Sequence, residues 1–326
     1  MTGQFLRSFG TALASFAALL PAAALAQDEA VYGQPVSGEI TLQKPVTPIM
    51  DSIHAFHDGI LLWTAIGIVL LVLALLVVVI IRFNAKANPK PSVTTHNTAI
   101  EVAWTVLPVL ILVVIAIPSF AVLTDQLTMP DGERKYLGSN IFSVGEIEVP
   151  APAFTIKATG VQWNWEYEYQ MPVAAAADAA ATEAVEAASA PADITASFAS
   201  FMLSDEEIAS LKPGQPRLLA VDNEIVVPVN ATIRMQVTSP PEGVIHAFAL
   251  PAFGIKIDAV PGKLNETWFN ARKEGIYYGQ CSELCGKDHA FMPIAVRVVS
   301  QEQFDAWWQA LQAGSVGTAN ATLPAV

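Results

Sequence analysis

Two long uncharged stretches dominate the hydrophobic pattern of this 326-residue chain. Residues 59–81 and 102–124 contain no Asp, Glu, Lys or Arg, although Pro108 and Pro118 interrupt the second stretch. About 20 apolar residues in a helix suffice to cross the hydrocarbon core of a bilayer. Buried core helices are the alternative, but such helices seldom lack polar residues on every face. The pattern therefore predicts two transmembrane helices.

The charges beside the two stretches orient this hairpin. The connecting residues 82–101 carry Arg82, Lys86 and Lys90, and no acid before Glu101. The outer flanks carry Asp51, Asp58, Asp125 and Asp131. Because cytoplasmic loops are enriched in Lys and Arg, we expect residues 82–101 to form a cytoplasmic linker. Both outer flanks are then expected outside the cytoplasm.

The N-terminus has the pattern of a secretory signal peptide. Arg7 precedes an apolar run over residues 9–20, and a small-residue motif ends at Ala26. This arrangement is typical of a cleaved signal, whereas the run is short for a third transmembrane helix. We expect removal of residues 1–26, which leaves 27–58 as an extracytoplasmic N-terminal segment.

After residue 124 the hydrophobic pattern alternates instead of running on. Over residues 154–170 aromatic and apolar positions alternate with polar or acidic ones, which is the period of a strand. Residues 217–239 contain two or three further strand-like runs, and EGIYYGQ and MPIAVRVVS are two more. Short strands with regular turns predict an all-β sandwich or small barrel. A short helix is expected over residues 301–311.

Two segments fit neither pattern. Residues 173–197 are rich in Ala and acids and contain no aromatic residue, so they can bury little surface. We interpret them as an insertion, either weakly helical or a mobile loop. Residues 314–326 are small and polar and are expected to form a flexible tail. Residues 125–313 then form one extracytoplasmic domain of ordinary size.

The charge balance limits the partners of this domain. From residue 125 onward the chain carries 24 Asp and Glu against 12 Lys and Arg. This sign disfavours nucleic-acid binding. It suits a basic protein partner steered by long-range attraction, although ordinary solubility would give the same composition.

The only two cysteines lie in the stretch CSELCGKDHAFM, which also contains a histidine and a methionine. A disulfide between Cys281 and Cys285 would close a very small, strained loop. A thiol redox pair usually has C-x-x-C spacing. The third interpretation is a metal site, because the two thiols, His289 and Met292 together form a copper-selective set.

A copper site in this stretch needs a second histidine. One thiolate, two imidazoles and a weak axial ligand can hold one copper, whereas two thiolates can bridge two coppers. Only His246 and His289 lie in the soluble domain. His246 begins an apolar strand-like run that can fold back onto the cysteine stretch, although an isolated histidine near a strand end is more often structural.

At this point the sequence resembles subunit II of the haem-copper cytochrome c oxidases, of the bacterial kind, over residues 48–311. The resemblance rests on TPIMDSIHAFHDGIL, EVAWTVLPVLILVVIAIPS, TGVQWNWEYEY, KPGQPRLLAVDNEIVVPVNATIRM, VIHAFALPAFGIKIDAVPG and YYGQCSELCGKDHAFMPI. It implies a two-helix transmembrane hairpin and a cupredoxin-like β-domain with a dinuclear copper centre, CuA. The implied ligands are His246, Cys281, Cys285, His289, Met292 and the main-chain carbonyl of Glu283.

The resemblance also implies a function and partners. Such a subunit accepts electrons from cytochrome c and passes them to the haem and copper centres of subunit I, where oxygen becomes water and protons are pumped. The expected surroundings are subunit I, the other oxidase subunits and the lipid bilayer. The expected location is the bacterial cytoplasmic membrane, with the C-terminal domain in the periplasm.

Further residues acquire roles only through the resemblance. The carboxylate of Glu283 matches a magnesium ligand shared with subunit I, Trp163 matches the tryptophan that receives the electron, and Glu101 matches the mouth of a proton path. Without the resemblance these would be a surface acid, a core aromatic residue and an interfacial charge. The candidates for an acidic docking face are Glu166, Glu168, Asp222 and Glu242.

The sequence departs from the family at one position and leaves alternatives open. Lys263 stands where the family usually has arginine, which puts two-pronged hydrogen bonding there in doubt. No C-x-x-C-H motif is present, so the electron donor is expected to be a separate protein. A quinol-oxidase subunit II would lack the copper ligands. A membrane-tethered copper chaperone with a C-x₃-C site would have a thioredoxin-like α/β domain, and a purely structural adaptor would not need the ligand set.

Overall fold

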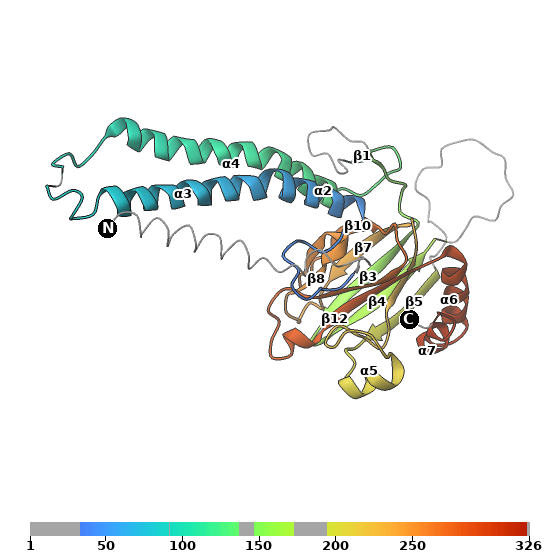
Figure 1. Ribbon diagram of the computed structural model, residues 1–326. Coiled ribbons are helices and arrows are strands. Elements are labelled where there is room, and N and C mark those ends of the chain that lie inside the picture. The colour runs from blue at the N-terminus through green and yellow to red at the C-terminus, as the bar shows by residue number, and fades with distance from the viewer. Residues whose placement is uncertain (1–32, 91, 137–146, 173–193, 325–326) are drawn as a thin grey trace. The chain divides into compact units, whose positions relative to one another are not determined.

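The computed structural model describes residues 33–90, 92–136, 147–172 and 194–324. The expected signal peptide and most of the Ala-rich segment lie outside these residues. Within them the chain forms a helical hairpin and a β-sandwich, which is the fold class that the sequence predicts (Figure 1).

The hairpin consists of two long helical segments that run in opposite directions (Figure 1). The first joins α2 (Pro48–Phe56), the π-helical turn η2 (His57–Leu61) and α3 (Leu62–Arg82), and the second is α4 (Thr98–Leu127). Thr47 and Asn97 cap the two N-termini with their side-chain oxygens. The helices extend beyond the uncharged stretches 59–81 and 102–124, and both are long and apolar enough to cross a membrane. No residue of α3 is buried, as expected of a helix that faces lipid or other subunits.

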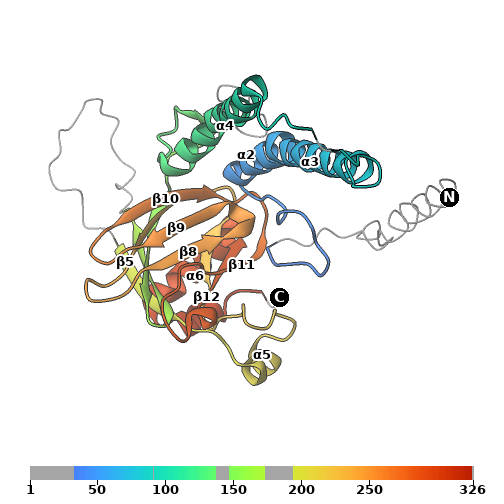
Figure 2. The same ribbon diagram turned by 90° about the vertical axis from the view of Figure 1, so that its left-hand side faces the viewer.

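Two five-stranded sheets form the sandwich (Figures 1 and 2). The first has the order β10-β7-β3-β4-β5, with the strands Asn265–Asn270, Thr232–Thr238, Phe154–Val161, Asn164–Met171 and Ile194–Ser200. The second has the order β6-β12-β11-β8-β9, with the strands Ile225–Pro228, Pro293–Val299, Gly275–Cys281, His246–Leu250 and Ile255–Ala259. Strands β1 (Lys135–Tyr136) and β2 (Ile147–Glu148) form a separate small ribbon.

The core lies between the two sheets and extends beneath a C-terminal helix. In β3 every second side chain is buried, as the alternating pattern predicts. Helix α6 (Gln301–Ala313) covers part of the core with Phe304 and Trp307. Their rings lie 5.3 Å from Phe154 and 5.4 Å from Tyr169, centroid to centroid. The helix expected over 301–311 is therefore present, two residues longer.

The aromatic alternation over residues 154–170 belongs to two strands and not to one. Strands β3 and β4 pair antiparallel with Val161 opposite Asn164, so Gln162 and Trp163 form a two-residue turn. The buried positions are even-numbered in β3 and odd-numbered around Tyr167 in β4. That change of phase was visible in the sequence and marks the turn.

Three further segments differ from what the sequence predicts. Residues 194–197, assigned to the Ala-rich insertion, belong to β5, which pairs with β4 along its whole length. Helix α5 (Asp205–Leu211) was not expected, although a capping box of Ser204 and Glu207 marks its start. The flexible tail is wrong for residues 314–324, which include helix α7 (Val316–Asn320).

Tertiary contacts explain the order of this tail. Ala319 is fully buried, and Trp307 donates a hydrogen bond from Nε1 to Asn320 Oδ1 at 3.1 Å. Arg297 donates from Nη1 to the carbonyl oxygen of Pro324 at 3.0 Å. These bonds reach across the fold, so a small and polar local composition could not reveal them.

The helical hairpin is hydrogen-bonded to the end of strand β8. A 3₁₀ turn, η3 (Pro251–Phe253), follows that strand. Thr47 Oγ1 donates to the carbonyl of Phe253 at 2.7 Å, and Gln126 Nε2 donates to the carbonyl of Gly254 at 2.8 Å. The strand that begins with His246 is therefore connected at its far end to both long helices.

Candidate metal centre

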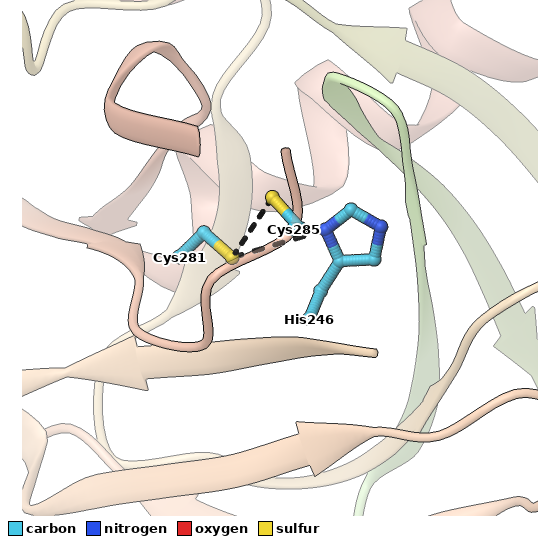
Figure 3. A group of neighbouring side chains, drawn as sticks. All are labelled: His246, Cys281 and Cys285. Carbon is cyan, nitrogen blue, oxygen red and sulfur yellow. Dashed lines mark hydrogen bonds between the residues drawn. The ribbon is translucent and has the colours of Figure 1, made fainter. Parts of the chain in front are cut away.

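Strand pairing brings the candidate ligands together. Strands β8 and β11 are antiparallel neighbours with Cys281 opposite Phe248, so His246 at the start of β8 lies beside the end of β11. The chain then forms a loop that carries Cys285 and His289 and enters β12 directly after Met292. In Figure 3 the side chains of His246, Cys281 and Cys285 point toward one another.

The six candidate donor groups meet within a few ångströms. The two sulfur atoms lie 3.9 Å apart. Cys281 Sγ lies 3.8 Å from His246 Nδ1 and 3.3 Å from the carbonyl oxygen of Glu283. Cys285 Sγ lies 3.6 Å from His289 Nδ1 and 3.5 Å from Met292 Sδ. Each thiol thus has one imidazole and one weaker donor as neighbours.

Most of the site is buried, and burial favours the neutral forms of Cys285 and His246. Cys281, Cys285 and Met292 are almost inaccessible, and His246 is fully buried. Burial, with the neighbouring Cys281 thiol, raises the pKa of Cys285 to about 12. Burial and the nearby His289 lower the pKa of His246. Neutral imidazole is a metal ligand, and a bound cation would displace the thiol protons.

These donors fit a soft metal ion. Thiolate, imidazole and thioether groups together select copper over hard cations. The ligand atoms of His246, Cys281 and Cys285 all lie within 4.8 Å of one another. His246 Nε2 is buried and has no hydrogen-bond partner among the described residues, so only its Nδ1 is engaged with the site. The cluster therefore indicates a copper site.

Strands β3 and β4 contact the candidate ligands from one side of the cluster. A Cβ atom at Gly160 would lie 2.9 Å from Cγ of His246, so only glycine leaves room for the imidazole. Trp165 is fully buried and donates from Nε1 to the carbonyl of Met292 at 3.3 Å. Its ring also meets the imidazole of His246 edge-on, 6.0 Å between centroids. The first sheet thus contacts two candidate ligands, His246 on β8 and Met292 directly before β12.

Trp163 lies in the β3–β4 turn and touches the ligand loop. Its Nε1 donates to the carbonyl oxygen of Cys285 at 3.3 Å, and Lys287 Nζ lies 5.5 Å from its ring centroid. The side chain is half-buried and packs against the core. Trp163 is therefore partly exposed to solvent and at the same time in contact with the core and the ligand loop.

The four candidate docking acids occupy different settings. Glu166 and Glu242 are exposed. Glu168 lies 3.9 Å from Lys157 Nζ, so its charge is partly offset. Asp222 accepts hydrogen bonds from the backbone N–H groups of Phe201 and Asn223, both at 2.7 Å. The bond from Phe201 ties Asp222 to the residue that follows β5, 21 positions earlier in the chain, so the structure gives Asp222 a structural role.

The remaining candidates lie apart from the cluster or at its edge. Glu101 lies in the first turn of α4, where Oε1 accepts the N–H of Asn97 at 3.1 Å and completes the helix cap. The side chain of Glu283 is exposed while its carbonyl faces Cys281. Lys263 is exposed in the turn after β9.

Sequence reasoning missed three residues around the ligands. Gly160 and Gly286 allow close approach, and Gln162 donates from Nε2 to the carbonyl of Cys285 at 2.8 Å. A glycine inside a strand pattern signals close backbone approach, so Gly160 could have been found. Nothing local distinguishes Gln162 from any polar turn residue.

Comparison with known proteins identifies the family. Residues 154–299 match the cytochrome c oxidase subunit II periplasmic domain, and residues 35–122 match the transmembrane domain of the same subunit. The chain belongs to the cytochrome c oxidase subunit II family. A membrane-bound subunit with an extracytoplasmic C-terminal domain, part of an oxidoreductase complex, follows from this membership.

Individual relatives cover most of the chain. A probable cytochrome c oxidase subunit 2 of Rickettsia felis is 44% identical over 274 residues, which span 84% of this chain and 72% of that protein. Cytochrome c oxidase subunit 2 of Cereibacter sphaeroides is 36% identical over 320 residues, 94% of this chain and 91% of that protein. The periplasmic domain of cytochrome oxidase subunit II (CoxB) of Bradyrhizobium japonicum, a crystal structure, is 49% identical and covers 54% of this chain and 99% of its own, with a TM-score of 0.38.

Proposed function

We propose that this subunit receives single electrons from cytochrome c at a dinuclear copper centre, CuA, and passes them to the haem and copper centres of subunit I. There oxygen would be reduced to water and protons pumped. One observation carries the proposal: two thiols, two imidazoles, a thioether and a carbonyl converge on one buried point.

The division of the donors supports two copper ions and not one. Cys281 has His246 and the carbonyl of Glu283 as neighbours, and Cys285 has His289 and Met292. Two thiols, two imidazoles and two weaker donors are enough ligands for two copper ions that share the thiolates. Bound copper would supply a one-electron acceptor and donor at this point.

The protein would hold these groups in fixed positions and exclude water from them. Four of the ligand side chains are buried, and three of the six ligand positions begin, end or adjoin strands of the second sheet. Ligands held by packed strands cannot relax far when the charge of the site changes. Such rigidity favours fast electron transfer.

Surface residues would guide the donor to the site. Trp163 touches the ligand loop, and we propose that it receives the electron. The exposed acids Glu166 and Glu242 would attract a basic cytochrome c, with smaller effects from Glu168 and Asp222, which have partners of their own. Attraction between exposed charges acts over about 8 Å at physiological salt.

Two further roles complete the proposal. The exposed carboxylate of Glu283 would bind magnesium together with subunit I, since that ion prefers oxygen ligands. Glu101 would open a proton path at the cytoplasmic end of α4. We place the protein in a bacterial cytoplasmic membrane with its sandwich in the periplasm, in contact with subunit I, the other oxidase subunits and lipid. The alternative of a copper chaperone has no support in the described fold, which is a β-sandwich and not a thioredoxin-like domain.

Metal analysis of the full-length chain in detergent tests the proposal. After loading with copper we expect two copper ions per chain and, in the oxidised form, an unpaired electron with hyperfine coupling to two nuclei. Cys281→Ser should abolish that shared signal, whereas Ser282→Ala at the exposed neighbouring position should leave it unchanged. One copper per chain, or coupling to one nucleus, would refute the dinuclear centre.

A further inference from the structure

One backbone carbonyl in the ligand loop accepts two side-chain donors from the β3–β4 turn. The carbonyl oxygen of Cys285 lies 2.8 Å from Gln162 Nε2 and 3.3 Å from Trp163 Nε1. A carbonyl has two lone pairs and can accept both bonds. The bond from Gln162 has ordinary length, whereas that from Trp163 is longer than most N–H···O bonds.

The contact between turn and loop depends on the absence of a side chain at Gly286. A Cβ atom there would lie 2.8 Å from Trp163 Cζ2 and 3.2 Å from Gln162 Nε2. Gly286 also has φ of +127°, which disfavours other residues. Turn and loop are therefore packed directly against each other, immediately after a candidate copper ligand.

We propose that Gln162 is a positioning residue, which holds the Cys285 carbonyl against the indole of Trp163 so that the electron-receiving side chain and the copper-ligand loop keep one fixed contact. The inference rests on the proposed function. The long indole bond cannot fix the loop alone, so the shorter amide bond carries this task. From the carbonyl, covalent bonds lead through Cα and Cβ to the Cys285 sulfur.

The proposed electron transfer moves one electron and no atoms. One electron would leave the haem iron of cytochrome c, which would be oxidised, and would reduce the copper that these residues would hold. No bond forms or breaks and no proton moves at Gln162. The amide acts only through geometry, by keeping the indole and the ligand cysteine in hydrogen-bond contact.

A docking role for Gln162 is the competing interpretation, because its side chain is also exposed. The two roles give different results. A docking residue changes KM for cytochrome c and leaves the copper spectrum unchanged. A positioning residue changes the copper spectrum and the rate of electron uptake, and leaves KM unchanged.

The test uses the assembled oxidase with Gln162→Leu, which removes the donor. Gln162→Glu is measured beside it, since a carboxylate of the same length also cannot donate. We expect full copper content, altered copper–thiolate bands and hyperfine splitting, and electron uptake from reduced cytochrome c slowed about twofold to tenfold, the range that one hydrogen bond contributes. The matched control is Gln301→Leu, since the exposed Gln301 amide in α6 donates to the carboxylate of Asp305 at 2.7 Å and should change neither measurement.

Glycine variants provide a second, independent test of the proposal. Gly286→Ala should push the indole away and slow electron uptake as Gln162→Leu does. Gly214→Ala controls for backbone strain, because Gly214 has φ of +92° and no atom within 4 Å of an added Cβ. Raised KM with an unchanged spectrum, or no change in either Gln162 variant, overturns the positioning role. A wild-type oxidase whose subunit II holds no copper would instead overturn the proposed function.

Discussion

Replacement of Gly160 by alanine should displace a copper ligand without touching the metal itself. Gly160 lies on β3, on the other sheet from His246, and its missing side chain makes room for the imidazole. An added Cβ would lie 2.9 Å from Cγ, 3.0 Å from Cβ and 3.0 Å from Cδ2 of His246. Ordinary carbon–carbon contacts are about 3.5–4.0 Å. One of the two groups must therefore move by about half an ångström or more.

That displacement can be compared with what a metal site tolerates. Ligand distances in metal sites vary by only about 0.2 Å, and His246 is fully buried beside the rigid ring of Trp165. Overpacking in a dense core costs about 1–3 kcal/mol. If most of that strain is relieved by moving His246, copper affinity should fall about tenfold to a hundredfold.

Competition against a copper chelator measures this loss on the full-length chain in detergent. The control is Ala158→Val, which overfills the same inner face of β3 two residues away. That variant should lower the unfolding temperature without a selective loss of copper. If Gly160→Ala binds copper with wild-type affinity and an unchanged spectrum, the close approach of β3 does not position His246, and the reasoning fails.

The remaining predictions concern Trp163, Glu101 and two buried tyrosines. Trp163→Gln should slow electron uptake from cytochrome c on the order of tenfold or more while copper content stays constant; wild-type uptake would exclude Trp163 from the route. Glu101→Gln can still accept the N–H of Asn97, so slowed turnover with intact copper reduction would indicate proton delivery and not loss of the helix cap. Tyr169→Phe should destabilise the protein by about 1–3 kcal/mol, because the buried backbone of Val226 loses both of its bonds to the phenol. Tyr167→Phe should cost less than Tyr169→Phe in the same thermal unfolding assay, because its buried hydroxyl has no hydrogen-bond partner among the described residues; equal losses would contradict this. Burial raises the pKa of both phenols far above 10, so the free energy of unfolding should fall as pH rises above 10, where only the unfolded chain loses these protons.

The two membrane helices and most strands could be predicted because each depends on a local pattern. An uncharged stretch long enough to span a bilayer needs no tertiary information. Alternation in β3 likewise reports burial directly, whereas β12 is a mostly apolar run that is buried at every position. The cysteine loop was recognisable because the twelve residues Cys281–Met292 contain four candidate donor side chains.

Other features could not be predicted because distant contacts create them. His246 was a candidate ligand through the family resemblance, because its closeness to Cys281, 35 residues away, arises only from the pairing of β8 with β11. The tail after Ala313 looks unstructured by composition, yet Trp307 and Arg297 bind it. Asp222 looked like a free surface acid until its two backbone donors were seen. The deciding partner lies 35 residues away for His246, 13 and 27 residues away for the two bonds to the tail, and 21 residues away for the Phe201 N–H that binds Asp222.

Strand β8 and the turn after it connect the membrane helices to the candidate metal centre. Gly254 follows the turn at the end of β8, and a Cβ there would lie 2.8 Å from Ile53 and 3.2 Å from the backbone of Met50, both in α2. His246 begins the same five-residue strand. A rigid strand thus joins a ligand at one end to a close helix contact at the other. The candidate ligand His246 is thereby tied to the hairpin, whereas the candidate ligands of the cysteine loop depend on β11, β12 and the β3–β4 turn. The proposed electron transfer to subunit I would require a fixed distance from the copper centre to that subunit. The contacts of Gly254, Phe253 and Gln126 provide such a constraint through His246.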